Sequence, residues 1–589
     1  MHYLPTFRTP PGKKYIKLHA TNYALWKQTL NENSPYSSYN LDHLGLIAGM
    51  VDELGLSELI DIVIKQDHEQ RQVSVGTCVK AMILNGLGFV NRALYLMPHF
   101  FKDKPVERLL GEGVAAEHLN DDALGRALDT IYAYGPEALY GQLAAQAVKR
   151  LGLSCKVGHI DTSSFHVDGV YNSDQEDVPE GVIHITQGYS RDHRPDLNQV
   201  ILQLISEHQT GIPLWMDALS GNSSDKESFR QTLNAHLKQL HDGVGLSLIV
   251  ADSALYTAQT LRDLGDFPWV MRVPETIGGT RELILAASGE WLETRPERAY
   301  TVLCSNYGGV KQRWLVVYTR AAHGRAEQTV NKQHLKQSQA EYKAFNALAK
   351  RSFACAADAE AALAHLQKTL KVVALHDPYI VEVEGFKGKG RPSKDRKPDI
   401  VSYRIEAGVA SVLETRHRKI QQKSCFIIAS NQLEDVQLSH EELLDYYTPG
   451  QQKVERGFRF LKDPWFMANT LFLKSPKRIM ALMMIMTLCL LIYGALEYRI
   501  RQTLQQNQQT FPTQLGTTSA KPSARWVFQF FAGIHVLLID SYREVILNCN
   551  EYHHQLLNLL GERYIRLYAN SGYQGCGMSV RRNFRGSRR

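Results

Sequence analysis

The sequence has few of the features that mark a secreted or zinc-thiolate protein. Its 589 residues include only eight cysteines, and no two of them form a C-x-x-C pair. None stands at zinc-ligand spacing from a pair of histidines. The N-terminal segment lacks the continuous apolar stretch of a signal peptide. We therefore expect reduced, mostly buried thiols in a reducing cytoplasm.

Repeats, compositional bias and a large net charge are also lacking. Hydrophobic residues make up 44% of the chain and charged residues 22%, which excludes a mainly disordered protein. Glycine and proline follow no fixed period, which excludes collagen-like and simple repeat architectures. The formal net charge of +7 permits a polyanionic partner without requiring one.

One uncharged segment raises the question of a membrane span. Residues 479–496 contain 18 residues without a charge, which is the lower limit for a spanning helix. The segment is solitary, and charged residues flank it on both sides. A helix buried on all sides in a large core has the same composition. We expect such a core helix and keep a membrane anchor as the alternative.

The hydrophobic pattern divides the chain into five parts. The first is helical, and the second has strands followed by alternating strands and helices, which predicts a mixed α/β sheet. The third is an α/β insertion, and the fourth returns to helices. The fifth combines a polar linker at residues 502–523, an apolar helical piece and a basic tail. The five parts are residues 1–150, 151–274, 275–430, 431–500 and 501–589.

The strands of the second part are predicted from short runs rich in β-branched residues and bounded by Gly, Pro, Asn and Asp. These runs are VGHIDTSSF, GVIHITQGYS, LNQVILQLISE and IPLWMDALSG. An amphipathic helix follows, then the apolar run LSLIVADSAL, a second helix and the strand WVMRVP.

Three acidic residues stand out by their context. Asp161 ends the first predicted strand, Asp252 ends the fourth or fifth, and Glu455 lies on a helix. Two carboxylates at one sheet edge repel each other, but they suit a hard divalent cation. A third carboxylate from a crossing helix would complete a two-metal site for phosphoryl transfer.

The basic residues that follow Glu455 fit the same chemistry. Arg459 and Lys462 lie four and seven residues later, so the three side chains are expected on one helix face. Cations beside a catalytic carboxylate suit a phosphodiester substrate. Alone, each acid would read as a strand-end or surface residue. Three other acids compete for the third role, although they lack the cationic face; these are Glu441, Glu442 and Asp445.

These residues resemble the DDE transposases of bacterial insertion sequences, whose catalytic core is ribonuclease H-like. The resemblance rests on the stretches HIDTSSF, GYSRDHRPDLNQ, GNSSD, IVADSALYT and ERGFRFLKDP. Glu455 and Lys462 match the last part of a Tyr-x2-Arg-x3-Glu-x6-Lys signature. Thr448 and Gln451 occupy the signature Tyr and Arg positions, and the nearest tyrosine is Tyr447.

The resemblance implies a fold class and an activity. The fold is α/β, a ribonuclease H-like mixed sheet flanked by helices, with a helical N-terminal domain and a β-rich insertion between the second and third acids. The activity is metal-dependent cleavage at insertion-sequence ends, followed by strand transfer into target DNA. Asp161, Asp252 and Glu455 would be catalytic and would bind two Mg²⁺ ions, which Mn²⁺ could replace.

The resemblance also implies partners and DNA contacts. The partners are double-stranded DNA, as terminal inverted repeats and target, and a second copy of the chain in the DNA complex. No membrane is implied, and the location is the bacterial cytoplasm at the nucleoid. The helices of residues 1–150 would bind element ends.

Two further basic stretches are candidate DNA contacts. Arg191 and Arg194 lie in GYSRDHRPD, and Lys389 and Arg391 lie in the basic loop 387–397. Arginine pairs with phosphate bidentately, and narrow minor grooves attract it. A solvated loop explains either stretch equally well.

Two other functions remain open from the sequence. One is a ribonuclease H-like nuclease that hydrolyses DNA without strand transfer. The other is a non-catalytic or membrane-anchored DNA-binding protein that uses residues 479–496 as its anchor.

Overall fold

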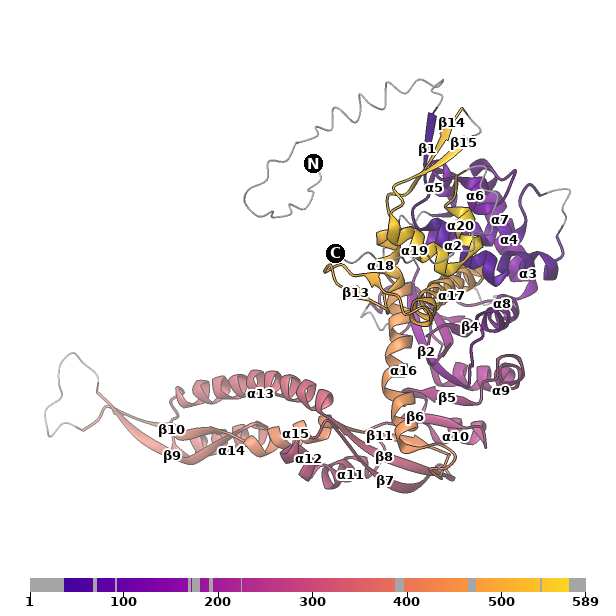
Figure 1. The fold of residues 1–589 in the computed structure, drawn as a ribbon. Coiled ribbons are helices and arrows are strands. Elements are labelled where there is room, and N and C mark those ends of the chain that lie inside the picture. The colour runs from indigo at the N-terminus through magenta and orange to yellow at the C-terminus, as the bar shows by residue number, and fades with distance from the viewer. Residues whose placement is uncertain are drawn as a thin grey trace, which may run out of the picture. The chain divides into compact units, whose positions relative to one another are not determined.

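The chain forms two compact units in the computed structural model (Figure 1). The first unit combines residues 1–151 with 461–589, and the second is the continuous segment 152–460. The residues that the structure describes are 36–66, 71–89, 93–167, 171, 179, 181–189, 194–223, 225–386, 397–463, 473–540 and 543–570.

An eight-stranded mixed sheet, here called the core sheet, organises the second unit. Its strand order is β4-β3-β2-β5-β6-β11-β8-β7. The strands β2, β3 and β4 are antiparallel neighbours, whereas β5 and β6 run parallel to β2. The bounds are β2 Val157–His166, β3 Gln199–Glu207, β4 Pro213–Ser220, β5 Leu248–Ala251, β6 Trp269–Val273, β7 Arg298–Tyr307, β8 Val310–Thr319 and β11 Cys425–Ser430.

Helical crossovers make the parallel part of the sheet possible. The helix α9 (Asp225–Val244) leads to β5, and α10 (Ala258–Leu264) leads to β6. The predicted mixed α/β sheet flanked by helices is confirmed. The described residues of the run GVIHITQGYS, 181–189, do not form a strand, however. Of its residues, Thr186 forms only an isolated bridge with Gln199.

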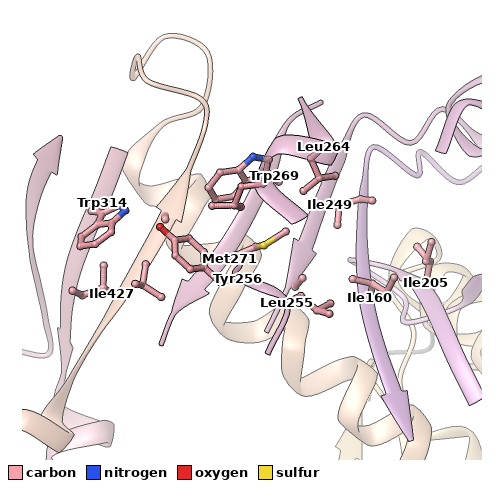
Figure 2. Packing of buried hydrophobic residues seen from close by; sticks show 14 of the residues in the cluster. Ile160, Ile205, Ile249, Leu255, Tyr256, Leu264, Trp269, Met271, Trp314 and Ile427 are labelled. Carbon is pink, nitrogen blue, oxygen red and sulfur yellow. The ribbon is translucent and has the colours of Figure 1, made fainter. Parts of the chain in front are cut away.

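The core sheet buries side chains on both faces. Figure 2 shows one face, where Ile160, Ile249, Trp269 and Met271 pack together with Tyr256. Because successive side chains of a strand alternate between faces, the neighbouring residues point the other way. The opposite face carries its own apolar cluster, to which the helix α16 (His440–Leu461) contributes.

The insertion between β8 and β11, residues 320–424, is here called the arm. It contains α13 (Arg320–Ala349), α14 (Ala356–Thr369), β9 (Val373–Gly385), β10 (Ile400–Ser411) and α15 (Leu413–Ser424). The strands β9 and β10 form an antiparallel ribbon of their own. A separate small core joins ribbon to helices, and its buried members are Phe345, Phe353, Ala359, Leu363 and Ile405.

The first unit is mainly helical, as predicted for residues 40–150. Its N-terminal helices are α2 (Leu44–Leu54), α3 (Leu56–Val63), α4 (Val75–Gly86), α5 (Met97–Phe101), α6 (Val106–Leu110), α7 (Asp121–Tyr134) and α8 (Pro136–Leu151). The caps follow the sequence locally, since the Asn120 side chain accepts a hydrogen bond from the Ala123 amide at 3.0 Å.

The apolar segment 479–496 forms part of α17 (Pro476–Gln506), which packs against α2, α4, α7 and α8. By length and composition α17 could cross a membrane, but 83% of its apolar window is buried inside the structure. This degree of burial agrees with the core helix that the sequence predicts for residues 479–496. Near its start, Arg478 and Asp129 of α7 form an ion pair at 2.7 Å. Residues from Leu461 onward therefore group with the N-terminal helices, whereas the sequence assigned 431–500 to the catalytic core.

The C-terminal part differs from its predicted helical character. It contains the short strands β12 (Phe511–Pro512) and β13 (Thr518–Ser519), α18 (Ala524–Phe530), the hairpin β14 (His535–Ile539) and β15 (Arg543–Leu547), α19 (Glu551–Leu560) and α20 (Glu562–Leu567). The prediction of helix was wrong for residues 535–539 and 543–547, which form strands. Positive φ angles at Gly533, Asp540 and Asn548 interrupt any helix there. The strand β14 instead pairs with β1 (Tyr36–Asn40).

Candidate active site

Strand register places two of the predicted acids beside each other. Ile160 of β2 pairs with Ala251 of β5 in the parallel ladder, so the next residues, Asp161 and Asp252, are neighbours. Adjacent strands lie about 4.8 Å apart. Asp252 directly follows β5, as predicted. Asp161 lies in the middle of β2 and not at its end, because β2 continues to His166 through its pairing with β3.

Both aspartates belong to the face of the core sheet that α16 covers. Val157 lies four residues before Asp161 in β2, and Val250 lies two residues before Asp252, so each valine shares a sheet face with its aspartate. Both valines belong to the apolar cluster that packs against α16. The Asp161 carboxylate accepts a hydrogen bond from the Thr162 amide at 2.8 Å. The register and this shared face thus bring together the carboxylates that the sequence predicted to meet.

Tyr447 of α16 connects the helix to Asp252. Its hydroxyl donates to Asp252 Oδ1 at 3.4 Å, and the same oxygen accepts the Ser253 amide at 2.7 Å. Burial and then the negative charge of Asp252 raise the pKa of Tyr447, so its phenol stays protonated and remains a donor. This contact is made by the tyrosine that lies one place before the signature position.

Arg272 is a site residue that the sequence did not single out. Ala251 of β5 pairs with Met271 of β6, so Arg272 continues the row formed by Asp161 and Asp252. Its guanidinium lies 5.6 Å from the ring centroid of Phe426, within cation–π range. The positive charge of Arg272 opposes the upward shift in the Tyr447 pKa. Its only sequence signal is its place in WVMRVP, which gains meaning once the strand register is known.

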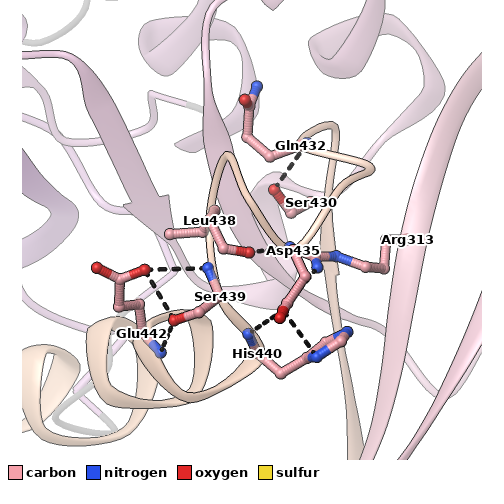
Figure 3. Close-up of polar contacts among 8 residues, drawn as sticks. All are labelled: Arg313, Ser430, Gln432, Asp435, Leu438, Ser439, His440 and Glu442. Carbon is pink, nitrogen blue, oxygen red and sulfur yellow. Dashed lines mark hydrogen bonds and ion pairs between the residues drawn. The ribbon is translucent and has the colours of Figure 1, made fainter.

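A network of polar contacts fixes the start of α16 (Figure 3). Ser439 and Glu442 form a capping box, in which the Glu442 amide donates to Ser439 Oγ at 3.2 Å and the Ser439 amide donates to Glu442 Oε2 at 3.0 Å. The buried Arg313 guanidinium donates to the Leu438 carbonyl at 2.6 Å. Asp435 accepts the His440 amide at 2.8 Å. These contacts set where the helix begins and hence where its later residues fall.

The acids that compete for the third role are engaged in this part of α16. Glu442 belongs to the capping box just described. Glu441 and Asp445 lie 2.9 Å and 3.6 Å from the guanidinium nitrogens of Arg298 on β7. Each of the three acids therefore has a structural partner near the start of the helix.

Glu455 lies further along α16, and its side chain is 55% exposed. Its carboxylate is 3.8 Å from Arg459, as expected for residues one turn apart. Lys462 follows the last residue of α16. Within the described ranges, no group of three or more His, Cys, Asp or Glu side chains is close enough to hold one metal ion. The structure therefore pairs the two aspartates without gathering Glu455 into the same cluster.

Comparison with known proteins gives the family. The sequence model described as Transposase DDE domain matches residues 160–492, more than half of the chain. The chain belongs to the DDE transposase family. A second model, described as Domain of unknown function (DUF4277), matches residues 36–145 of the transposase. A comparison of the sequence with curated proteins finds no match.

A solved structure resembles the transposase at low similarity. It is a cryo-EM structure of piggyBac transposase in a synaptic complex with hairpin DNA. The identity is 10% and the TM-score is 0.35, and the likeness covers 83% of this chain and 79% of the other.

The predicted DNA contacts of the transposase are described only in part. Arg194 is half-exposed and pairs with Asp196 at 2.8 Å. The hydrogen bond from Arg194 lowers the pKa of Asp196. Arg191, Lys389 and Arg391 lie outside the described residues, so their predicted roles stay predictions.

Proposed function

We propose that this transposase cuts DNA at the ends of an insertion sequence and joins the freed ends to target DNA. The observation that carries the proposal is the pairing of Asp161 with Asp252 on the face of the core sheet covered by α16. Two carboxylates on adjacent parallel strands are costly without a cation, and they suit a hard divalent ion.

In this proposal the chain's own residues have distinct roles. Asp161 and Asp252 hold the divalent cation pair, and Glu455 completes the ligand set from α16. Bound Mg²⁺ would activate the attacking oxygen and stabilise the leaving one. Tyr447 orients Asp252 through its hydroxyl, and Arg272 places positive charge beside the aspartates. Arg459 and Lys462 provide cations for the phosphodiester backbone.

The reaction has two phosphoryl-transfer steps. In cleavage, a water oxygen bonds to phosphorus while the bond from phosphorus to the 3′ oxygen breaks, which leaves a 3′-hydroxyl and a 5′-phosphate. In strand transfer, the 3′-hydroxyl oxygen bonds to a target phosphorus and displaces a target 3′ oxygen. Neither step needs a covalent enzyme–DNA bond, so neither requires a serine or tyrosine nucleophile.

The proposal includes partners and location. The partners are double-stranded DNA, as terminal inverted repeats and target, and a second copy of the chain, because two ends are cut together. The location is the bacterial cytoplasm at the nucleoid. Lys389 and Arg391 of the basic loop 387–397, together with Arg191 and Arg194, are proposed as additional DNA contacts.

The first test replaces the three acids one at a time. Asp161→Asn, Asp252→Asn and Glu455→Gln should each lower Mg²⁺-dependent cleavage of DNA bearing the repeats that flank the gene by at least about a hundredfold. DNA binding should change little. A gel assay that also scores joined products separates a transposase from a nuclease without strand transfer.

Matched controls come from the same helix. Glu441→Gln and Asp445→Asn alter acids on α16 that pair with Arg298, so they should keep cleavage. Normal cleavage by Glu455→Gln together with loss in either control variant would move the third role to that acid. Normal cleavage by Asp161→Asn would contradict the proposed site.

A second test measures the metal site without relying on cleavage. The paired carboxylates repel in the metal-free protein, so Asp161→Asn should leave its thermal stability unchanged or raised. Mg²⁺ or Mn²⁺ should raise the melting temperature of the wild type more than that of the variant, because the ion binds only the folded site. Equal metal-induced shifts in both proteins would argue against a shared ion.

A further inference from the structure

A pocket at the base of the arm includes Arg272, Tyr447 and Glu455 of the candidate active site and extends from them onto α13 and α15. Its volume is about 470 Å³, and its walls come from β6, α13, α15, β11 and α16. We call it the arm groove. The residues used below are Arg272, Arg325, Thr329, Lys423, Thr448 and Glu455.

Three cations from three separate elements line the arm groove. Arg272 comes from β6, Arg325 from the first turns of α13, and Lys423 from the end of α15. Arg325 and Lys423 are exposed, and neither takes part in an ion pair with any residue that the structure describes. Only Glu275 and Glu455 are acidic among the lining residues. The groove therefore presents convergent positive charge, which an anionic ligand would neutralise.

The groove also offers the geometry of a backbone-binding site. The ring of Phe426 lies under the Arg272 guanidinium and orients that planar group, which can bind phosphate through two hydrogen bonds. Thr329 and Thr448 add hydroxyl donors to the lining, and hydroxyls commonly contact phosphate oxygens. Thr448 and Glu455 lie two turns apart on α16, so a DNA strand bound along this wall of the groove would pass Glu455.

We propose that the arm groove binds the DNA sugar–phosphate backbone next to the bond to be cut, with Arg325 and Lys423 as its main phosphate contacts. The inference rests on the proposed function, because it adds the base of the arm to the DNA-binding surface beside Glu455. It assigns this role to α13 and α15 at the base of the arm, independently of the basic loop at its tip.

The test measures how DNA binding depends on salt. A fluorescein-labelled DNA duplex of random sequence is titrated with the full chain in EDTA, and anisotropy gives the affinity at several salt concentrations. Each phosphate contact contributes about 0.9 to the slope of log affinity against log salt. The double variant Arg325→Ala/Lys423→Ala should lower the magnitude of this slope by about 1.8.

The matched control removes one arginine and one lysine from the arm outside the groove. Lys343 of α13 and Arg418 of α15 are exposed and do not line it, so Lys343→Ala/Arg418→Ala should keep the wild-type slope. Arg325→Lys keeps the positive charge, so it should retain the salt slope. It should lower the affinity at each salt concentration, because lysine cannot bind phosphate bidentately. All of these positions are at the surface, so folding should be unaffected.

The outcome is independent of catalysis because the assay contains no divalent metal. An unchanged slope in Arg325→Ala/Lys423→Ala would overturn the arm groove as a DNA site, even if the acid variants confirm the proposed chemistry. An equal fall in the control pair would overturn it too, since the effect would then be general charge. A specific fall, with cleavage retained by Asp161→Asn, would leave the groove standing while the proposed active site fails.

Discussion

The core sheet and the arm are both built from strands and helices of the same unit, but they use their strands in opposite ways. In β3 of the core sheet every residue is buried. In β9 of the arm only Val373 is buried, and the other positions are half-buried or exposed. The core sheet joins strands distant in sequence, whereas β9 and β10 form a ribbon from neighbouring segments.

This difference separates two tasks. A sheet buried on both faces can hold two like-charged carboxylates in fixed register, because the cost is spread over a large apolar core. A two-stranded ribbon is marginally stable in water alone, so the arm relies on its small core with α13 and α14. What the arm gains is exposed surface, including Arg325 and Lys423 of the arm groove.

The largest expected effects would show whether the two regions fold separately. Trp269→Ala empties a fully buried site in the core sheet and should destabilise the protein by about 3–5 kcal/mol. Phe353→Ala truncates a buried ring of the arm and should loosen α14, β9 and β10 alone. Hydrogen exchange read by mass spectrometry should show lost protection throughout the core sheet in the first variant and only in the arm in the second. If Phe353→Ala also exposed β2 and β5, the regions would be one cooperative unit.

An intermediate effect compares two helix caps. Ser439→Ala removes the hydroxyl of the capping box at the start of α16 and should cost about 1 kcal/mol in urea unfolding. In the arm, Cys355 caps α14 through a sulfur that accepts the Asp358 amide at 3.4 Å. Because a hydroxyl is a better acceptor, Cys355→Ser should stabilise the arm by a few tenths of a kcal/mol. Destabilisation by Cys355→Ser would mean that the thiol has another structural role.

The smallest effect concerns pH. The backbone amide and hydroxyl of Ser439 lower the pKa of Glu442 below its usual value of 4.5. The depressed pKa stabilises the fold fully above the unfolded-state pKa, and this contribution is lost as pH falls through the folded-state pKa. The stability difference between wild type and Ser439→Ala should therefore narrow on acidification below about pH 4.5. A constant difference at all pH values would show that the hydroxyl acts on the helix without acting through Glu442.

Much of the core sheet could be predicted from the sequence, because its strands are short, β-branched and bounded by turn residues. The adjacency of Asp161 and Asp252 followed from the same reasoning. Arg272 could not be predicted, because its place beside the aspartates depends on the β5–β6 register. The distance of Glu455 from the two aspartates depends on where α16 begins. Contacts with Arg313 and Asp435 fix that start, and they cannot be read from the sequence.

The C-terminal hairpin shows a different limit. The run HVLLI fits a helix or a strand equally well by composition, since it has no clear period. Its pairing with β1 decides the outcome, and β1 lies at the other end of the described chain. Contacts of this kind are invisible to a local pattern.

The β1–β14 pairing also determines when the first unit can finish folding during synthesis. The strand β14, partner of β1, emerges from the ribosome about 500 residues after it, which at ~5–20 residues per second is about 25–100 s. The continuous second unit emerges completely within that interval. Until α17 and β14 also emerge, the apolar faces of the N-terminal helices stay uncovered. A nascent chain whose emerged part ends between residues 460 and 476 would therefore carry a finished core sheet and an unfinished first unit. Chaperones would be expected to bind it at the N-terminal helices.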